Sequence, residues 1–269
     1  MARARTTRRQ RPLGTGWGVR TAATVVLIFL ALPLVVLIGS SFNASSLVRF
    51  PPQGWSLRWY ASVLSSHDWV VSINLSIVVA LMVVPTVVIL GTLAAYGLFR
   101  GKQRGFLTAA FMSPLVVPEV MVGLGLLTYL QPTGLINSVA GLWLAHSLVT
   151  LPFVIRTVST SVQGLDPSLE RAAQSLGAGP IRVFTSVILP QLRPGIIAGG
   201  VFAAVLSLGE VAVSMFVSGP NTTTVPLRIM SAVQFELDPS AAAVSTLLML
   251  VSMVVMIVIS RWVDLSRAF

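Results

Sequence analysis

The sequence contains no cysteine, only two histidines and only eight acidic residues in 269. Without cysteine there is no disulfide framework, no thiol nucleophile and no cysteine-ligated metal. The histidines, His67 and His146, stand far apart with no metal-ligand spacing. A glycine-rich phosphate loop ending in Lys-Ser/Thr is also missing. These absences argue against redox, metal and nucleotide-hydrolysing chemistry in this chain, and we expect it to bind no cofactor itself.

Charged residues are scarce as well, at 10% of the chain, whereas 55% of the residues are hydrophobic and the mean hydropathy is +0.87. A single soluble core of this size cannot bury so much apolar surface, so lipid is the expected solvent. The formal charge of +10 resembles a nucleic-acid signature, but the arginines stand at the ends of apolar runs. Membrane topology therefore explains the charge better than nucleic acid does.

Six apolar runs approach or exceed the roughly 20 residues that cross a bilayer. They cover residues 19–41, 70–99, 106–130, 138–158, 194–217 and 241–263. We predict an all-α integral membrane protein with six transmembrane helices in a single domain, residues 19–269. Residues 1–18 form a basic cytoplasmic tail that is expected to be disordered. The first run could instead be a signal peptide, but it is longer than the usual apolar region of about 7–15 residues, and we expect it to be retained.

Threading the six spans places most of the basic residues on one side of the membrane. That side holds the N-terminal arginines with Arg20, Arg100, Lys102, Arg104, Arg156, Arg171, Arg182, Arg193, Arg261 and Arg267, and the other holds Arg49, Arg58 and Arg228. Because cytoplasmic loops carry the excess of Lys and Arg, both termini are predicted to be cytoplasmic.

The longest cytoplasmic connection is the polar loop, residues 159–193, between the fourth and fifth spans. Asp166 and Pro167 form an N-cap and first-turn pair, and the good helix formers that follow end at Gly177. Pro180 begins a second helix, which gives a helix, a glycine turn and a helix below the bilayer. Apolar side chains of this segment need a cover, either a docked partner or the chain's own spans.

The residues RAAQSLGAGPIRVFTSVILP, 171–190, resemble the EAA loop of ATP-binding-cassette importer permeases. The resemblance implies the type I importer permease fold and a coupling helix that docks on an ATPase. The residues expected to make that contact are Glu170, Arg171, Ala172, Ala173, Gln174, Ser175, Leu176, Gly177 and Ala178. One departure is visible, because Arg171 stands where the family usually has an acidic residue and Glu170 comes one place earlier. A shift of one residue turns a side chain by about 100°.

The resemblance covers most of the chain from about residue 41. The segments SPLVVPEVMVGLGLL, 113–127, and SLGEVAVSMFVSGPNTTTVPLRIMSAVQFELDPSAAAVSTLL, 207–248, look like the spermidine/putrescine permease branch. It implies a multi-pass protein of the bacterial cytoplasmic membrane with three kinds of protein partner: a second, similar permease, a dimeric ATPase that uses ATP and Mg, and an extracytoplasmic solute-binding protein. The chain itself would hydrolyse nothing.

Two carboxylates lie inside predicted spans, where a charge is costly unless it faces a polar cavity or a partner. Glu119 follows Pro118, and the third helix is expected to break there and expose carbonyls to a path. Glu210 suits a cationic solute, and His146 is a third path candidate. A structural hydrogen bond for Glu119 and a contact to the paired permease for Glu210 remain open.

Polyamines are the expected solute, because of the branch resemblance and the two intramembrane carboxylates. Phosphonates such as 2-aminoethylphosphonate, iron and thiamine are alternatives on the same architecture. A secondary transporter or channel is the alternative class, but it would need its own coupling-ion site, and the sequence offers only scattered carboxylates and no inverted repeat that we detect.

Overall fold

The structure, a computed structural model, describes residues 16–46, 50–101, 104–236 and 238–262. These residues form helices and turns, with an isolated bridge between Asn43 and Trp55. The long helices are α1 Trp17–Ser41, α3 His67–Arg100, α6 Val139–Gln163, α9 Leu189–Gly209 and α12 Ser240–Trp262. The shorter ones are α2 Arg58–Ser65, α4 Arg104–Val116, α5 Glu119–Leu130, η1 Gln131–Thr133, α7 Pro167–Ser175, α8 Pro180–Val183, η2 Phe184–Ile188, α10 Ser214–Val217, α11 Val225–Ser231 and η3 Ala232–Glu236.

The predicted all-α membrane architecture is confirmed. Among the described residues, five helical segments are long and apolar enough to cross a bilayer, and α4 with α5 supplies a sixth if the bent pair counts as one span. The helix α1 begins at Trp17, two residues before the predicted start. Most of the predicted basic tail, residues 1–15, lies outside the described residues.

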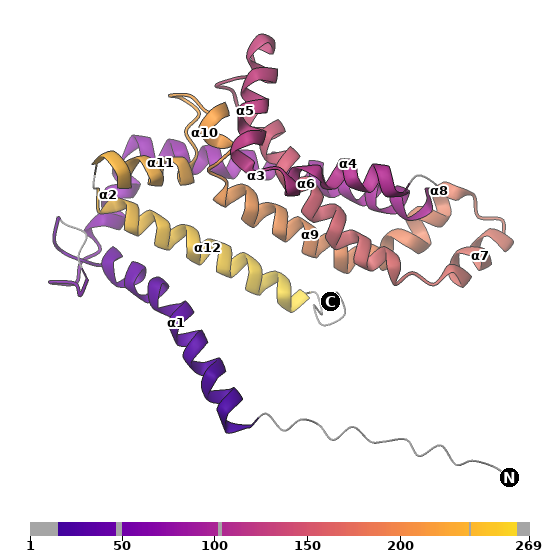
Figure 1. Ribbon diagram of the computed structural model, residues 1–269, viewed down its shortest axis with the longest axis horizontal. Coiled ribbons are helices and arrows are strands. Elements are labelled where there is room, and N and C mark those ends of the chain that lie inside the picture. Colours follow the sequence, from indigo (N-terminus) through magenta and orange to yellow (C-terminus); the bar gives the residue numbers. More distant parts are fainter. Residues whose placement is uncertain (1–15, 47–49, 102–103, 237, 263–269) are drawn as a thin grey trace.

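The third span is broken, as the prolines predicted. The axes on either side of Val117 and Pro118 are bent by 102°, so α5 runs in a different direction from α4 and lies beside α10 (Figure 1). Pro118 has no N–H to continue the α4 ladder, and its own carbonyl accepts from Met121 N at 2.8 Å to start α5. A single backbone position therefore ends one helix and caps the next.

Helices α3, α6 and α9 form the centre of the molecule, and they contribute most of the largest buried cluster. Val154 of α6 is fully buried between two glycines of the neighbouring helices. A Cβ atom on Gly91 of α3 would lie 2.7 Å from its Cγ1, and one on Gly199 of α9 would lie 3.1 Å from it. The small residues let the three backbones approach closely, as small-residue spacings do in membrane helices.

The fifth span differs from its prediction at both ends. The helix begins at Pro180, and its π-helical segment η2 lies just before Pro190, whose ring would clash with the carbonyl four residues earlier in a regular helix. The predicted end at residue 217 is wrong. Helix α9 stops at Gly209 because Glu210 is extended and its carboxylate accepts from Val213 N at 2.8 Å. The fourth span runs to Gln163, five residues beyond its predicted end.

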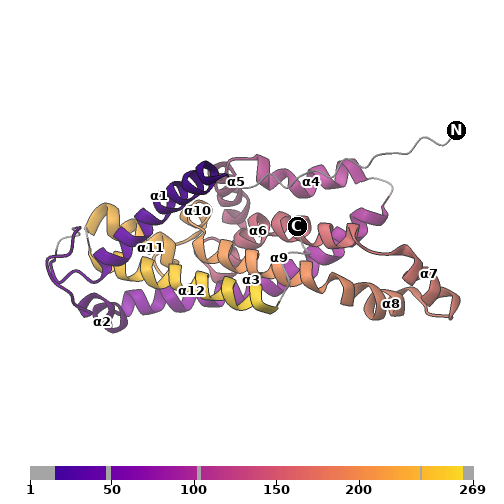
Figure 2. The same cartoon turned by 90° about the horizontal axis from the view of Figure 1, so that it is seen from below.

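Different short helices lie at the two ends of the molecule. Helices α7 and α8 lie at one end and α2 and α11 at the other (Figures 1 and 2). At the α2 end, Trp69 donates from its indole nitrogen to Ser240 Oγ at 3.0 Å, and Arg228 forms an ion pair with Asp68 at 2.6 Å. Helix α1 contacts α12, diverges from the bundle toward its own N-terminus (Figure 1) and is exposed along most of its length.

We expect Gly91→Ala to destabilise the protein, because its Cβ would meet the stiff, β-branched Val154. Overpacking of this kind costs about 1–3 kcal/mol, and it should lower the thermal midpoint in detergent. Adding Val154→Ala should restore part of the loss. The control is Gly97→Ala on the same helix, where an added Cβ has no heavy atom within 4 Å. Equal midpoints for the two alanine variants would contradict the tight crossing.

Candidate docking loop and translocation path

Helix α7 is delimited by strong local signals on both sides. The Asp166 carboxylate accepts from Ser168 N at 2.8 Å, and Pro167 occupies the first helical position. This backbone N–H lowers the pKa of Asp166 because it stabilises the ionised carboxylate. Gly177 ends the helix with a φ of +84°, while its N–H bonds to Gln174 and that of Ala178 bonds to Ala173. The predicted helix and glycine turn are confirmed.

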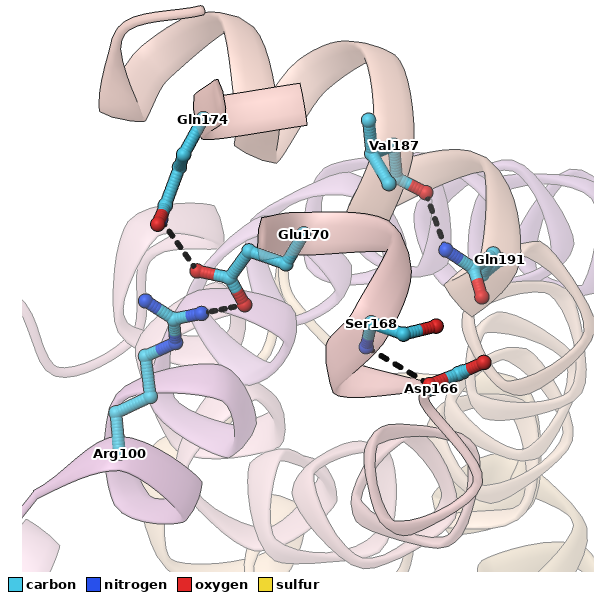
Figure 3. A network of polar contacts seen from close by, with 7 residues as sticks. All are labelled: Arg100, Asp166, Ser168, Glu170, Gln174, Val187 and Gln191. Atoms are coloured by element: carbon cyan, nitrogen blue, oxygen red, sulfur yellow. Dashed lines mark hydrogen bonds and ion pairs between the residues drawn. The ribbon is translucent and has the colours of Figure 1, made fainter. Parts of the chain in front are cut away.

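The Glu170 side chain is bound by residues of its own chain, on α3 and on α7. Its carboxylate forms an ion pair with Arg100 at the end of α3 and accepts from Gln174 Nε2 at 3.2 Å, as Figure 3 shows. The Arg100 guanidinium also lies 4.7 Å from the ring centroid of Tyr96, and Tyr96 packs against Phe184 at 5.1 Å between centroids. We name Tyr96, Arg100, Glu170 and Phe184 the α3–α7 latch.

The predicted docking residues divide between a packed and an exposed side of α7 and of the turn that follows it. Ala173 and Ala178 are half-buried and pack against the central cluster of α3, α6 and α9. Glu170 is also half-buried. The remaining ones, Arg171, Ala172, Gln174, Ser175, Leu176 and Gly177, are exposed, and Leu176 is 89% exposed. The resemblance implied that all nine residues contact the ATPase, whereas the structure leaves only part of them open to a partner.

Sequence reasoning missed Arg100 as a member of this site. It was read only as a cytoplasmic charge at the end of a span, and no spacing relates residue 100 to residue 170. The signal in the sequence is indirect, because a basic residue at the end of α3 and an acidic one in the polar loop are predicted on the same side of the membrane.

The two candidate path carboxylates lie at or just before the start of helices that pack on each other, since a Cβ atom on Gly123 of α5 would meet the Phe216 ring of α10. Glu119 is exposed in the first turn of α5, directly after the break at Pro118. Glu210 is 8% exposed and caps the turn before α10 through Val213 N. Both therefore lie where a predicted span loses its helical continuity, and non-helical backbone in a membrane is tolerated where it is buried or lines a polar cavity.

His146 is buried and holds three helical elements together. Its Nδ1 lies 3.0 Å from Ser207 Oγ on α9, and its Nε2 lies 2.9 Å from Ser214 Oγ on α10. Both ring nitrogens are therefore occupied, and the side chain is 1% exposed. In the described chain this is the geometry of a packing residue, and its role in a path stays a prediction.

Two hollows lie away from these carboxylates. One of about 540 Å³ lies between α3, α4 and α6 and includes Met112, Arg156 and Gln163 in its lining. A smaller, polar one of about 140 Å³ lies between the start of α3 and the segment that leads into α11, with Asp68, Asn221 and Arg228 in its lining. Glu119, Glu210 and His146 line neither of them.

The fold is that of a multi-pass membrane protein whose third span is broken and whose helix α7 is exposed between two spans. The chain belongs to the family described as the binding-protein-dependent transport system inner membrane component, whose sequence profile matches residues 54–267. It is therefore the multi-pass inner-membrane permease component of an ATP-binding-cassette importer, and the predicted family is confirmed.

Its relatives include two permeases of Escherichia coli strain K12. The chain is 38% identical over 232 residues to the putrescine transport system permease protein PotI, covering 82% of each chain. It is 30% identical over 238 residues to the spermidine/putrescine transport system permease protein PotC, covering 87% of this chain and 89% of that one.

Solved structures agree on the fold. A chain from a bacterial ABC transporter involved in the import of the acidic polysaccharide alginate matches with a TM-score of 0.72 at 16% identity, covering 91% of this chain and 96% of that chain. A second alginate transporter structure, in complex with an alginate pentasaccharide-bound periplasmic protein, matches with a TM-score of 0.68, also at 16% identity, and covers 91% and 92% of the two chains.

We expect His146→Phe to lower the thermal midpoint in detergent, because it leaves the Ser207 and Ser214 hydroxyls without their partner. An unsatisfied buried polar group costs about 1–3 kcal/mol. The neighbouring control is Ser147→Ala, since the Ser147 hydroxyl has no hydrogen-bond partner within the described residues. A His146→Phe protein of normal stability that fails to transport would instead place His146 in the path.

Proposed function

We propose that this chain is the permease subunit of an ATP-driven polyamine importer and that α7 docks on the ATPase. The observation that carries the docking is the open face of α7, which lies between the ends of α6 and α9. Arg171, Ala172 and Leu176 are exposed there, although the other side of the same helix is packed on the chain's own core. A short helix that packs on its own chain along one side and exposes the other side to solvent is suited to binding a partner protein.

The proposed assembly has four kinds of component. Two ATPase subunits use ATP and Mg on the cytoplasmic side, a second similar permease completes the path, and a solute-binding protein delivers the cargo at the α2 and α11 end. This chain would supply no catalytic residue. The excess of arginine at the α7 end supports a cytoplasmic position for α7 and both termini.

Polyamines fit the charge of the proposed path. Glu119 and Glu210 each lie at a break in a span, and the helices that begin at or after them, α5 and α10, pack together, so two acidic side chains are available to a cation. The relatives named above for putrescine and for spermidine/putrescine support the same substrate class. Solute selectivity would rest mainly on the binding protein.

The docking proposal predicts that the purified chain retains an ATPase, identified by its own sequence, when the two are expressed together. Ala172→Glu should remove that ATPase, because a charged, bulky side chain would stand on the open face of α7. The thermal midpoint of the permease alone should not change, since Ala172 is exposed. The control Ser65→Glu adds the same charge on exposed α2 at the other end of the molecule. Retention of the ATPase by the Ala172→Glu protein would refute this docking face.

The substrate proposal predicts ATP-dependent uptake of radiolabelled putrescine or spermidine by liposomes that contain the full assembly. Glu210→Gln should slow it by roughly tenfold, the effect of losing about 1.4 kcal/mol of charge stabilisation. Glutamine keeps an oxygen acceptor for Val213 N, so the turn before α10 should survive. Retention of the ATPase by the Glu210→Gln permease serves as the control that the variant still assembles. Uptake of an anion or a metal instead of polyamines would refute the substrate class, and unchanged uptake in Glu210→Gln would remove this residue from the path.

A further inference from the structure

Helix α7 carries two adjacent residues of opposite charge that face different ways. Successive residues of an α-helix are turned by about 100°. Glu170 and Ala173 therefore share the face that packs on the chain's own helices, whereas Arg171 and Ser175 share another. The burial pattern agrees, because the first two are half-buried and the second two are exposed.

The Glu170 carboxylate is already committed within the chain. One oxygen meets the Arg100 guanidinium, and the other accepts from Gln174 Nε2 (Figure 3). The side chain is only 20% exposed in this arrangement. A partner that needed this carboxylate would have to compete with a charge-assisted bond to a guanidinium, which is among the stronger hydrogen bonds of proteins.

Arg171 shows the opposite arrangement. Its side chain is exposed and makes no hydrogen bond or ion pair with the residues that the structure describes. Ser175 Oγ donates to the Arg171 carbonyl and leaves the guanidinium untouched. The small side chain of Ala172 beside it allows another backbone or side chain to come close.

We propose that Glu170 and Arg171 have separate roles in α7, one in positioning the helix and the other in recognising the ATPase. Glu170 is a positioning residue that locks the helix to the end of α3 through Arg100, and Arg171 is the charge that recognises an acidic site on the ATPase. The inference rests on the proposed docking of α7, and it names the chemistry of the partner's surface. A guanidinium recognises a carboxylate bidentately, which fixes orientation as well as attraction.

The recognition half is tested by retention of the co-expressed ATPase on the full-length permease. Arg171→Glu should reduce retention at least about tenfold, because an attraction becomes a repulsion. The matched control is Arg182→Glu, which makes the same charge change on exposed α8 and should retain the ATPase. Unreduced retention in Arg171→Glu, or an equal loss in Arg182→Glu, would overturn the assignment of Arg171. If the unaltered chain retains no ATPase, the docking proposal itself fails.

The positioning half is tested without the partner. Since the chain has no cysteine, Leu176→Cys gives one site for a spin label at the exposed end of α7. Glu170→Gln and Arg100→Gln should each raise the mobility of the label, while Arg171→Glu should leave it unchanged. The exchanged pair Arg100→Glu with Glu170→Arg should restore low mobility. A label that stays immobile in both glutamine variants would overturn the latch, whatever the ATPase does.

Discussion

The close approach of α3, α6 and α9 around Val154 is the constraint on which the rest of the structure depends. Helices in a bilayer gain little from hydrophobic contact with one another, so their association relies on tight packing of small residues. Gly91 and Gly199 provide the space for Val154 on either side. Helix α7 is connected to the ends of α6 and α9, and its inner face packs on their cluster. Its position is therefore an outcome of the packing of the spans.

Two spans lose their helical continuity, and the two candidate path carboxylates lie at those breaks. Pro118 ends α4 because it has no N–H to donate, and Glu210 follows the last residue of α9. Freed backbone groups in a membrane need internal partners, and the Glu210 carboxylate supplies one by accepting from Val213 N. The same charge that would attract a cation thus also holds the broken backbone in shape, so the break and the carboxylate belong to one structural unit.

The long elements and the local boundaries could be predicted from the sequence, but the pairing of distant residues could not. Apolar length predicted the spans, Pro118 predicted the break, and Asp166 with Gly177 predicted both ends of α7. These signals act within a few residues. The end of α9 was missed because Glu210 lies in a continuous apolar run, and apolarity alone does not distinguish a helix from a turn capped by a side chain. The two serine partners of His146 and the Arg100 partner of Glu170 are 61 or more residues away in the sequence, where no periodicity reaches.

Helix α7, the proposed docking helix, is attached to the spans by more than the chain that enters and leaves it. The covalent connections of α7 lead to α6 and α9, and the latch adds a third link to α3 through Arg100 and Glu170. Phe184 and Tyr96 place an aromatic contact beside this ion pair, so displacement of α7 would have to move or break a packed and charged junction. Packed junctions of this kind favour discrete arrangements over gradual deformation. A shift imposed on the outer face of α7 would therefore reach all three central helices together, and one of them, α9, carries the break at Glu210.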